Sequence, residues 1–153
     1  MNEHQETHAL VAFGDIEGAT HFVSAEEVFK RLFHNAMWLI TRPSRAISPG
    51  TRILFYQNGL GFKGHAIADE ISDNRSTPFG TDIFLSFSQQ LRLKECYEFI
   101  KPVSASSLLN NLGFITNKKY WGHSFRSTPR SISKEDYTII MNAAKRLESR
   151  HNA

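Results

Sequence analysis

The sequence predicts an α+β domain in which an antiparallel, barrel-like sheet of five to six strands is flanked by helices. Three observations predict it. The chain has 153 residues, about the length of one domain. Short apolar segments follow one another closely in its middle part and are separated by short turns, which is typical of antiparallel pairing. A helix pattern lies near each end. We therefore expect one domain over residues 8–149, with flexible termini at 1–7 and 150–153.

The first part of the chain reads as a strand followed by a helix. His8–Phe13 is an apolar run that ends at Gly14, which predicts a buried strand. Ser24 and Glu27 have the spacing of a capping box, which predicts that a helix begins there. The helix has an apolar face and is expected to end at Asn35.

The middle of the chain carries the remaining strands. Segments rich in β-branched and aromatic residues are separated by turn signals such as Ser48-Pro-Gly50 and Asn58-Gly59. We expect strands at residues 36–41, 51–56, 62–70, 83–87 and 91–103.

The C-terminal part combines two helix patterns with an aromatic and basic segment. Residues 104–112 are typical of a short helix capped by Ser104, whereas Ser133 and Asp136 have the spacing of a second cap. The final helix carries one apolar stripe, formed by Tyr137, Ile140, Met141, Ala144 and Leu147. Between these helices, residues 114–125 mix aromatic side chains with cations.

Composition narrows the class of protein. With 41% hydrophobic and 22% charged residues, a disordered chain, a collagen and a coiled-coil rod are excluded. No apolar run approaches the ~18–20 residues of a membrane span, and the polar, acidic start shows no signal peptide. A single cysteine excludes an internal disulfide, and the seven histidines are scattered without ligand spacing. We expect a cytoplasmic protein without a metal or another cofactor.

The net charge is +3, but positive and negative residues are unevenly distributed along the chain. Residues 1–30 hold one Lys and six Asp or Glu, whereas residues 108–153 hold eight Lys or Arg and three Asp or Glu. A basic last third is consistent with a polyanionic partner, and equally with a solvated charged surface.

Signals for catalysis are weak. Residues 59–64 carry three glycines with the spacing of a dinucleotide loop, but hairpin strands flank them, so a turn explains them better. Cys96 lies in an apolar strand, and we expect it to be buried and chemically quiet. Asp15 and Glu17 are the nearest to an acid–base pair, and Glu17 is better explained as a solvated side chain.

The two tryptophans are the main candidates for ligand binding. Trp38 opens a strand directly after a helix, and strand ends line pockets, although a core tryptophan would give the same pattern. Trp121 lies among cations and aromatic residues, as single-stranded nucleic acid or a splayed base would require. The alternative for Trp121 is an anchor that holds its loop to the core.

The C-terminal segment resembles the closing segment of EVE domains. Residues 108–122 read Leu-Leu-Asn-Asn-Leu-Gly-Phe-Ile-Thr-Asn-Lys-Lys-Tyr-Trp-Gly, and Phe125 and residues 132–137 follow. They match a family pattern of a short helix, L.FI.NK..W, a further aromatic residue, and I...D...I on a final helix. Upstream, Trp38, the turn at Pro49-Gly50, and the strands at 53–56 and 62–64 are similar to family segments, so the resemblance covers residues 8–147 in order.

This resemblance implies a PUA-like fold, a small mixed β-barrel flanked by helices, as in YTH and ASCH domains. It also implies a reader of modified bases that holds a flipped base in an aromatic pocket, with Trp38 as one wall. The turn with Gly14 and Asp15 would supply polar groups, and Phe79 would fall near another wall. The sequence departs from the family at Thr51, where an acidic residue is usual, and at the acidic turn. Asp15 would repel phosphate but could accept a hydrogen bond from a cytosine or adenine amino group.

We therefore predict a non-catalytic module that binds DNA or RNA carrying a modified base, for example a methylated one. The predicted pocket consists of Gly14, Asp15, Asn35, Trp38, Phe79 and Trp121. The predicted phosphate contacts are Arg42, Arg45, Lys118, Lys119 and Arg126.

Two alternatives remain open. An ASCH-like hydrolase acting on a modified nucleoside would need a Thr-Lys-Glu cluster, and only Lys63 and Glu70 flank a suitable strand. A protein-interaction domain would have no base pocket, and Trp38 would then be a core residue. An open pocket lined by Trp38 would favour the base reader, and we expect one face of a pocket-wall Trp38 ring to meet solvent.

Overall fold

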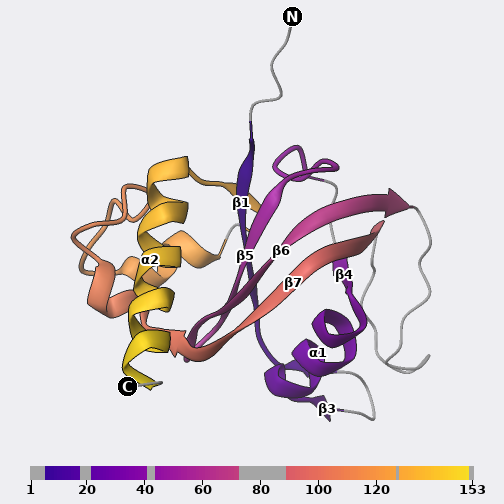
Figure 1. The fold of residues 1–153 in the computed structure, drawn as a ribbon, viewed down its shortest axis with the longest axis horizontal. Coiled ribbons are helices and arrows are strands. Elements are labelled where there is room, and N and C mark those ends of the chain that lie inside the picture. The colour runs from indigo at the N-terminus through magenta and orange to yellow at the C-terminus, as the bar shows by residue number, and fades with distance from the viewer. Residues whose placement is uncertain (1–5, 18–21, 41–43, 73–88, 127, 152–153) are drawn as a thin grey trace, which may run out of the picture.

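The structure is a computed structural model that describes residues 6–17, 22–40, 44–72, 89–126 and 128–151. Six strands form the main sheet in the order β4-β7-β6-β5-β1-β8. Their bounds are β1 His8–Phe13, β4 Met37–Ile40, β5 Arg52–Gln57, β6 Gly61–Ser72, β7 Gln89–Val103 and β8 Arg130–Ser131. A second sheet pairs β2 (Ile16–Glu17) with β3 (Phe22–Val23). The main sheet curls into a half-barrel (Figure 1), which confirms the predicted fold class.

Pairing in the sheet is mixed. β5 and β6 pair antiparallel, as the short turn between them predicts. β6 with β7 and β4 with β7 are also antiparallel pairs. β1 instead pairs with β5 in parallel, with His8 opposite Arg52 and Phe13 opposite Gln57. The segment that joins these two strands contains α1 and β4, which gives the chain the length that a parallel crossover needs.

Helices cover both faces of the sheet. α1 (Ala25–Leu32) and α2 (Lys134–His151) lie on opposite sides of it (Figure 1). Alternate residues of β1 therefore enter different cores: Ala9 and Val11 join the α1 side, whereas Leu10 joins the α2 side. A strand that is buried on both faces has a continuous run of apolar residues. This is why the sequence of β1 predicts a buried strand.

The predicted start of α1, capped by Ser24, is confirmed. The Ser24 hydroxyl accepts a hydrogen bond from the backbone N–H of Glu27 at 3.2 Å. A 3₁₀ turn, η1 (Phe33–Asn35), continues the helix. Ala36 then adopts φ = 55°, in the left-handed region, and this reverses the chain into β4. The second cap is also confirmed, because the Ser133 hydroxyl accepts from the backbone N–H of Asp136 at 3.0 Å.

Two local predictions are wrong. Residues 104–112 form only one 3₁₀ turn, η2 (Ala105–Leu108), and the Ser104 side chain does not cap it. Cys96 is exposed rather than buried. β6 and β7 shift register at this point, so that two residues of β7 oppose one of β6, and Glu95 takes φ = 50°. Such a bulge breaks the alternation on which the burial prediction relied. The strand predicted at 83–87 lies outside the described residues.

Two features are absent from the described residues. No helix among them has the length and apolarity to cross a membrane. They also contain no group of three or more His, Cys, Asp or Glu side chains that could hold a metal ion.

Candidate nucleic-acid interface

A cavity of about 180 Å³ opens where β1 ends. Its lining comes from β1 and the turn after it, from α1, from β4, and from Thr128 and Pro129. It includes Gly14, Asp15 and Trp38, three residues that the sequence predicted to share one pocket. Both β4 and β1 line this cavity, although three strands lie between them in the sheet order.

Trp38 is both a core residue and a wall of this cavity. Its side chain is only 4% exposed. Its ring packs against Phe55 at 4.7 Å between centroids and against the edge of Phe13 at 5.2 Å. The expectation that one face of the ring meets solvent is therefore wrong, because the aromatic cluster on the α1 side encloses it. What reaches the cavity is a small part of a firmly held ring.

Asp15 is exposed at the mouth of the cavity and tied to α1. Its Oδ1 accepts a hydrogen bond from the backbone N–H of Ala25 at 2.7 Å. That N–H belongs to the first turn of α1, where N–H groups lack intrahelical partners and favour a negative charge. Within the described part of the chain this is the one hydrogen bond of the carboxylate, so Oδ2 can accept another. Glu17 is exposed and does not line the cavity, which agrees with its interpretation as a solvated side chain.

Of the other predicted pocket residues, the structure describes Asn35 and Trp121, and neither lines this cavity. Asn35 lines a different cavity, of about 350 Å³, together with Glu70 and Arg92. Its side-chain amide donates to the carbonyl of Arg31 at 2.9 Å, so it closes the end of α1. The left-handed turn at Ala36 separates Asn35 from the Trp38 side of the chain. Phe79 lies outside the described residues.

Trp121 lines a third cavity, of about 610 Å³, next to the first. Residues missed by the sequence analysis contribute to it: Tyr56, Asn58 and Thr128. Asn58 was recognised only as part of a turn, and no local signal marked Thr128. The Thr128 hydroxyl accepts a hydrogen bond from the backbone N–H of Ala12 at 3.0 Å, and both residues border both cavities.

The Lys118 side chain forms hydrogen bonds with the protein backbone. Its ammonium donates to the backbone carbonyls of Leu109, Leu112 and Ile115, the middle one at 3.3 Å. These carbonyls belong to the segment that follows η2, and the Leu112 carbonyl also accepts from the backbone N–H of Ile115 at 3.3 Å. The ammonium therefore satisfies backbone acceptors of this segment. We therefore leave Lys118 out of the proposed phosphate contacts.

The remaining predicted cations differ in position. Arg126 is exposed and lines the Trp121 cavity. Lys119 is exposed and lies over the Tyr120 ring, 5.3 Å from its centroid. Arg45 is exposed in the loop after β4. Arg42 lies outside the described residues.

Comparison with known proteins places this architecture among solved folds. No protein-family model matches the sequence. A curated relative, the UPF0310 protein in the gntR 5' region of Bacillus licheniformis, is 28% identical over 106 residues, which cover 65% of this chain and 69% of the relative.

Several solved structures superpose on most of the chain. The YTH domain-containing protein mmi1, in a complex with RNA, has a TM-score of 0.64 at 11% identity, over 98% of this chain and 88% of that one. The YTH domain of Zygosaccharomyces rouxii MRB1, with N6-methyladenosine RNA, has a TM-score of 0.60 at 15% identity, over 93% and 88%. The fold is PUA-like. Human THYN1, with DNA containing 5-methylcytosine, has a TM-score of 0.56 at 12% identity, over 92% and 98%. ASCH from Zymomonas mobilis has the same TM-score at 13% identity, over 88% and 94%.

This PUA-like domain does not gather the cluster that an ASCH-like hydrolase would need, as far as its described residues show. Lys63 forms an ion pair with Glu98 at 3.6 Å and lies over the Phe29 ring. Glu70 lines the separate 350 Å³ cavity. Among the described residues that line the Trp38 cavity, Asp15 is the one carboxylate and there is no lysine.

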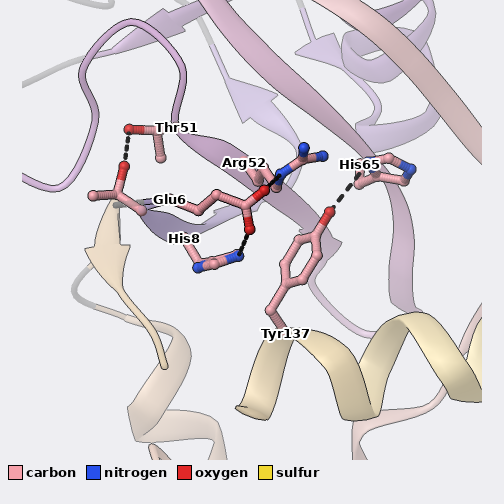
Figure 2. A network of polar contacts seen from close by, with 7 residues as sticks. Glu6, His8, Thr51, Arg52, His65 and Tyr137 are labelled. Atoms are coloured by element: carbon pink, nitrogen blue, oxygen red, sulfur yellow. Dashed lines mark hydrogen bonds and ion pairs between the residues drawn. The ribbon is translucent and has the colours of Figure 1, made fainter. Parts of the chain in front are cut away.

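A separate polar cluster occupies the other end of β1 in this PUA-like fold (Figure 2). Arg52 donates to Glu6 at 3.1 Å, and the Tyr137 hydroxyl lies 3.5 Å from His65 Nδ1. The rings of His8 and Tyr137 are 4.6 Å apart. Burial lowers the pKa of His8 and of His65, and the Arg52 cation lowers both further. Burial also raises the pKa of the Tyr137 hydroxyl. The cluster is distant along β1 from the Trp38 cavity, so it bears on stability rather than on that site.

Proposed function

We propose that this protein is a non-catalytic nucleic-acid-binding domain of the EVE type, and that it holds one modified base, such as a methylated one, in the Trp38 cavity. The observation that carries the proposal is that Gly14, Asp15 and Trp38 meet in one cavity. The similar folds of YTH and THYN1 domains solved with methylated RNA or DNA support it.

The chemistry of the cavity suits a base edge. Its volume of about 180 Å³ is below the ~300–1,000 Å³ of pockets for drug-sized ligands, so it suits one flat fragment rather than a whole nucleotide. Oδ2 of Asp15 accepts from the exocyclic amino group of cytosine or adenine. Trp38 and the apolar walls contact the ring and an added methyl group. Reaching this depth requires a base that is flipped out or single-stranded.

Cations of the chain contact the phosphates of the strand. These are Arg126, which lines the neighbouring Trp121 cavity, the exposed Lys119 and Arg45, and Arg42, which is assigned from the sequence alone. The Asp15 carboxylate repels phosphate, so the backbone passes outside the mouth of the cavity while the base enters it.

The test compares wild-type protein with Asp15→Asn in titrations of matched oligonucleotides. The single strands carry 5-methylcytosine, N6-methyladenosine or no modification, each as DNA and as RNA. Asparagine keeps an oxygen for the Ala25 N–H but replaces the second acceptor with a donor. We expect wild type to prefer one modified strand and Asp15→Asn to lose most of that preference.

Glu17→Gln is the matched control, because Glu17 is exposed and lies outside the cavity lining. It should retain the preference of the wild type. Equal affinity for modified and unmodified strands in the wild type would overturn the proposal, as would an unchanged preference in Asp15→Asn.

A further inference from the structure

The 610 Å³ cavity lies directly beside the Trp38 cavity. Ala12 and Thr128 line both of them, and the 3.0 Å hydrogen bond between these residues holds the ridge that separates the two spaces. On the far side of β1, the backbone N–H of Asn58 donates to the carbonyl of Phe13 at 2.8 Å, which fixes the wall of the larger cavity to the same strand end. A bound polymer that places one of its units in the first cavity therefore brings the next unit to the other cavity.

The lining of the larger cavity combines an aromatic surface with a cation. Tyr56 and Phe125 are buried and stacked at 4.0 Å between centroids. Trp121 is partly exposed and meets Phe125 edge-on, with an interplanar angle of 85°. The buried pair therefore holds the Trp121 ring at a fixed angle. Arg126 lines the same space.

The surrounding sequence is free of carboxylates. The chain contains no Asp or Glu between Glu98 and Glu135, a stretch that includes η3 (Trp121–Phe125) and the whole aromatic and basic segment. Partly exposed aromatic rings beside cations, in a segment without carboxylates, are the features of single-strand binding grooves.

We propose that this cavity binds the nucleotide adjacent to the modified base. Its base stacks on Trp121, and Arg126 contacts the phosphate that links the two nucleotides. This inference rests on the proposed function, because it takes the occupant of the Trp38 cavity as the first unit of the strand. It makes the protein a reader of a modified base within a strand, rather than a receptor for a free nucleoside.

The experiment uses three probes that carry the modification preferred by the wild type. These are the modified nucleoside, a trinucleotide with that nucleoside at its centre, and the same trinucleotide with abasic flanking positions. The wild type should bind the intact trinucleotide most tightly. Trp121→Leu keeps an apolar contact for Phe125 but removes the stacking ring. It should weaken trinucleotide binding by about tenfold to a hundredfold, the usual effect of losing one stacked base, and leave nucleoside affinity unchanged.

Two further variants make the test specific. Arg126→Gln is an exposed change that should fold normally, lower trinucleotide affinity and reduce the salt slope by about 0.7, the value for one phosphate of a single strand. Tyr120→Phe, beside Trp121 but outside the cavity lining, is the matched control and should bind as the wild type does. With abasic flanks, Trp121→Leu should cause no further loss.

The outcomes separate the two proposals. A trinucleotide that binds Trp121→Leu and Arg126→Gln as tightly as the wild type would overturn the adjacent subsite while leaving the base cavity in place. If Trp121→Leu weakens binding of modified and unmodified trinucleotides equally, and the wild type does not distinguish them, the base cavity and the pairing of the two sites both fail.

Discussion

Oδ1 of Asp15 accepts a hydrogen bond from the backbone N–H of Ala25 at 2.7 Å, so the carboxylate at the mouth of the cavity also holds the first turn of α1. The same helix carries Phe29, whose ring is 6.5 Å from that of Trp38. The polar edge and the aromatic wall of the cavity are thus positioned by one helix. Changes to Asp15 must be designed so that a loss of binding is not mistaken for a shift of α1.

The first prediction separates these two roles of Asp15 by stability. Asp15→Ala removes the acceptor for the Ala25 N–H and should lower the free energy of unfolding by about 1 kcal/mol, as loss of a helix-capping side chain does. Asp15→Asn retains an oxygen and should stay within about 0.5 kcal/mol of the wild type. Urea unfolding measures both. Equal stability of Asp15→Ala and wild type would show that the contact contributes nothing to α1.

The second prediction concerns Trp38. Because its ring is enclosed by Phe13 and Phe55, Trp38→Ala should cost about 3–5 kcal/mol of unfolding free energy through the cavity that it leaves. Tyr120→Ala, at a ring that is 55% exposed, should change stability by no more than about 0.5 kcal/mol. Thermal and urea unfolding of the two variants provide the comparison. A small effect at Trp38 would contradict the packing described here.

Much of the fold can be predicted from the sequence because the local sequence signals agree with the packing. The caps at Ser24 and Ser133 and the apolar run of β1 each correspond to an observed element. The resemblance to EVE domains also predicts that Gly14, Asp15 and Trp38 share one pocket, and all three line the same cavity.

Several local predictions are wrong because tertiary structure overrides the local sequence pattern. Alanine rarely adopts the left-handed conformation, so the sequence does not predict the turn at Ala36. This turn separates Asn35 from the Trp38 cavity. The bulge that exposes Cys96 depends on pairing between β6 and β7. The division between the Trp38 and Trp121 cavities depends on Thr128, which is far from Ala12 in sequence.

The third prediction contrasts neighbouring lysines. Lys118→Met removes the donor to three backbone carbonyls and should lower the free energy of unfolding by about 1 kcal/mol, with little effect on the salt dependence of oligonucleotide binding. Lys119→Met should do the reverse: stability should hold, while the slope of log affinity against log salt should become shallower by about 0.7. Urea unfolding and titrations at several salt concentrations measure both quantities. Identical behaviour of the two variants would show that the structure assigns these lysines wrongly.

The fourth prediction is that acid destabilises the domain through the cluster at the start of β1. Burial holds the pKa of His8 and of His65 below 6.5, their ordinary value, so the unfolded chain binds protons more readily than the folded one. Stability from the neutral rings is fully present above pH 6.5 and is lost as the pH falls toward their folded pKa values. Each ring contributes at most about 1.4 kcal/mol per pH unit in that window.

The measurement is urea unfolding at closely spaced pH values from 8 downward, for the wild type and for His8→Gln, His65→Gln and the double variant. Glutamine keeps a polar side chain of similar size and cannot titrate. We expect each single variant to reduce the acid slope and the double variant to reduce it further. At pH 8, where both histidines are neutral, any difference between the proteins reports packing against Tyr137 rather than protonation. A double variant that loses stability below pH 6.5 as steeply as the wild type would place the acid sensitivity outside this cluster.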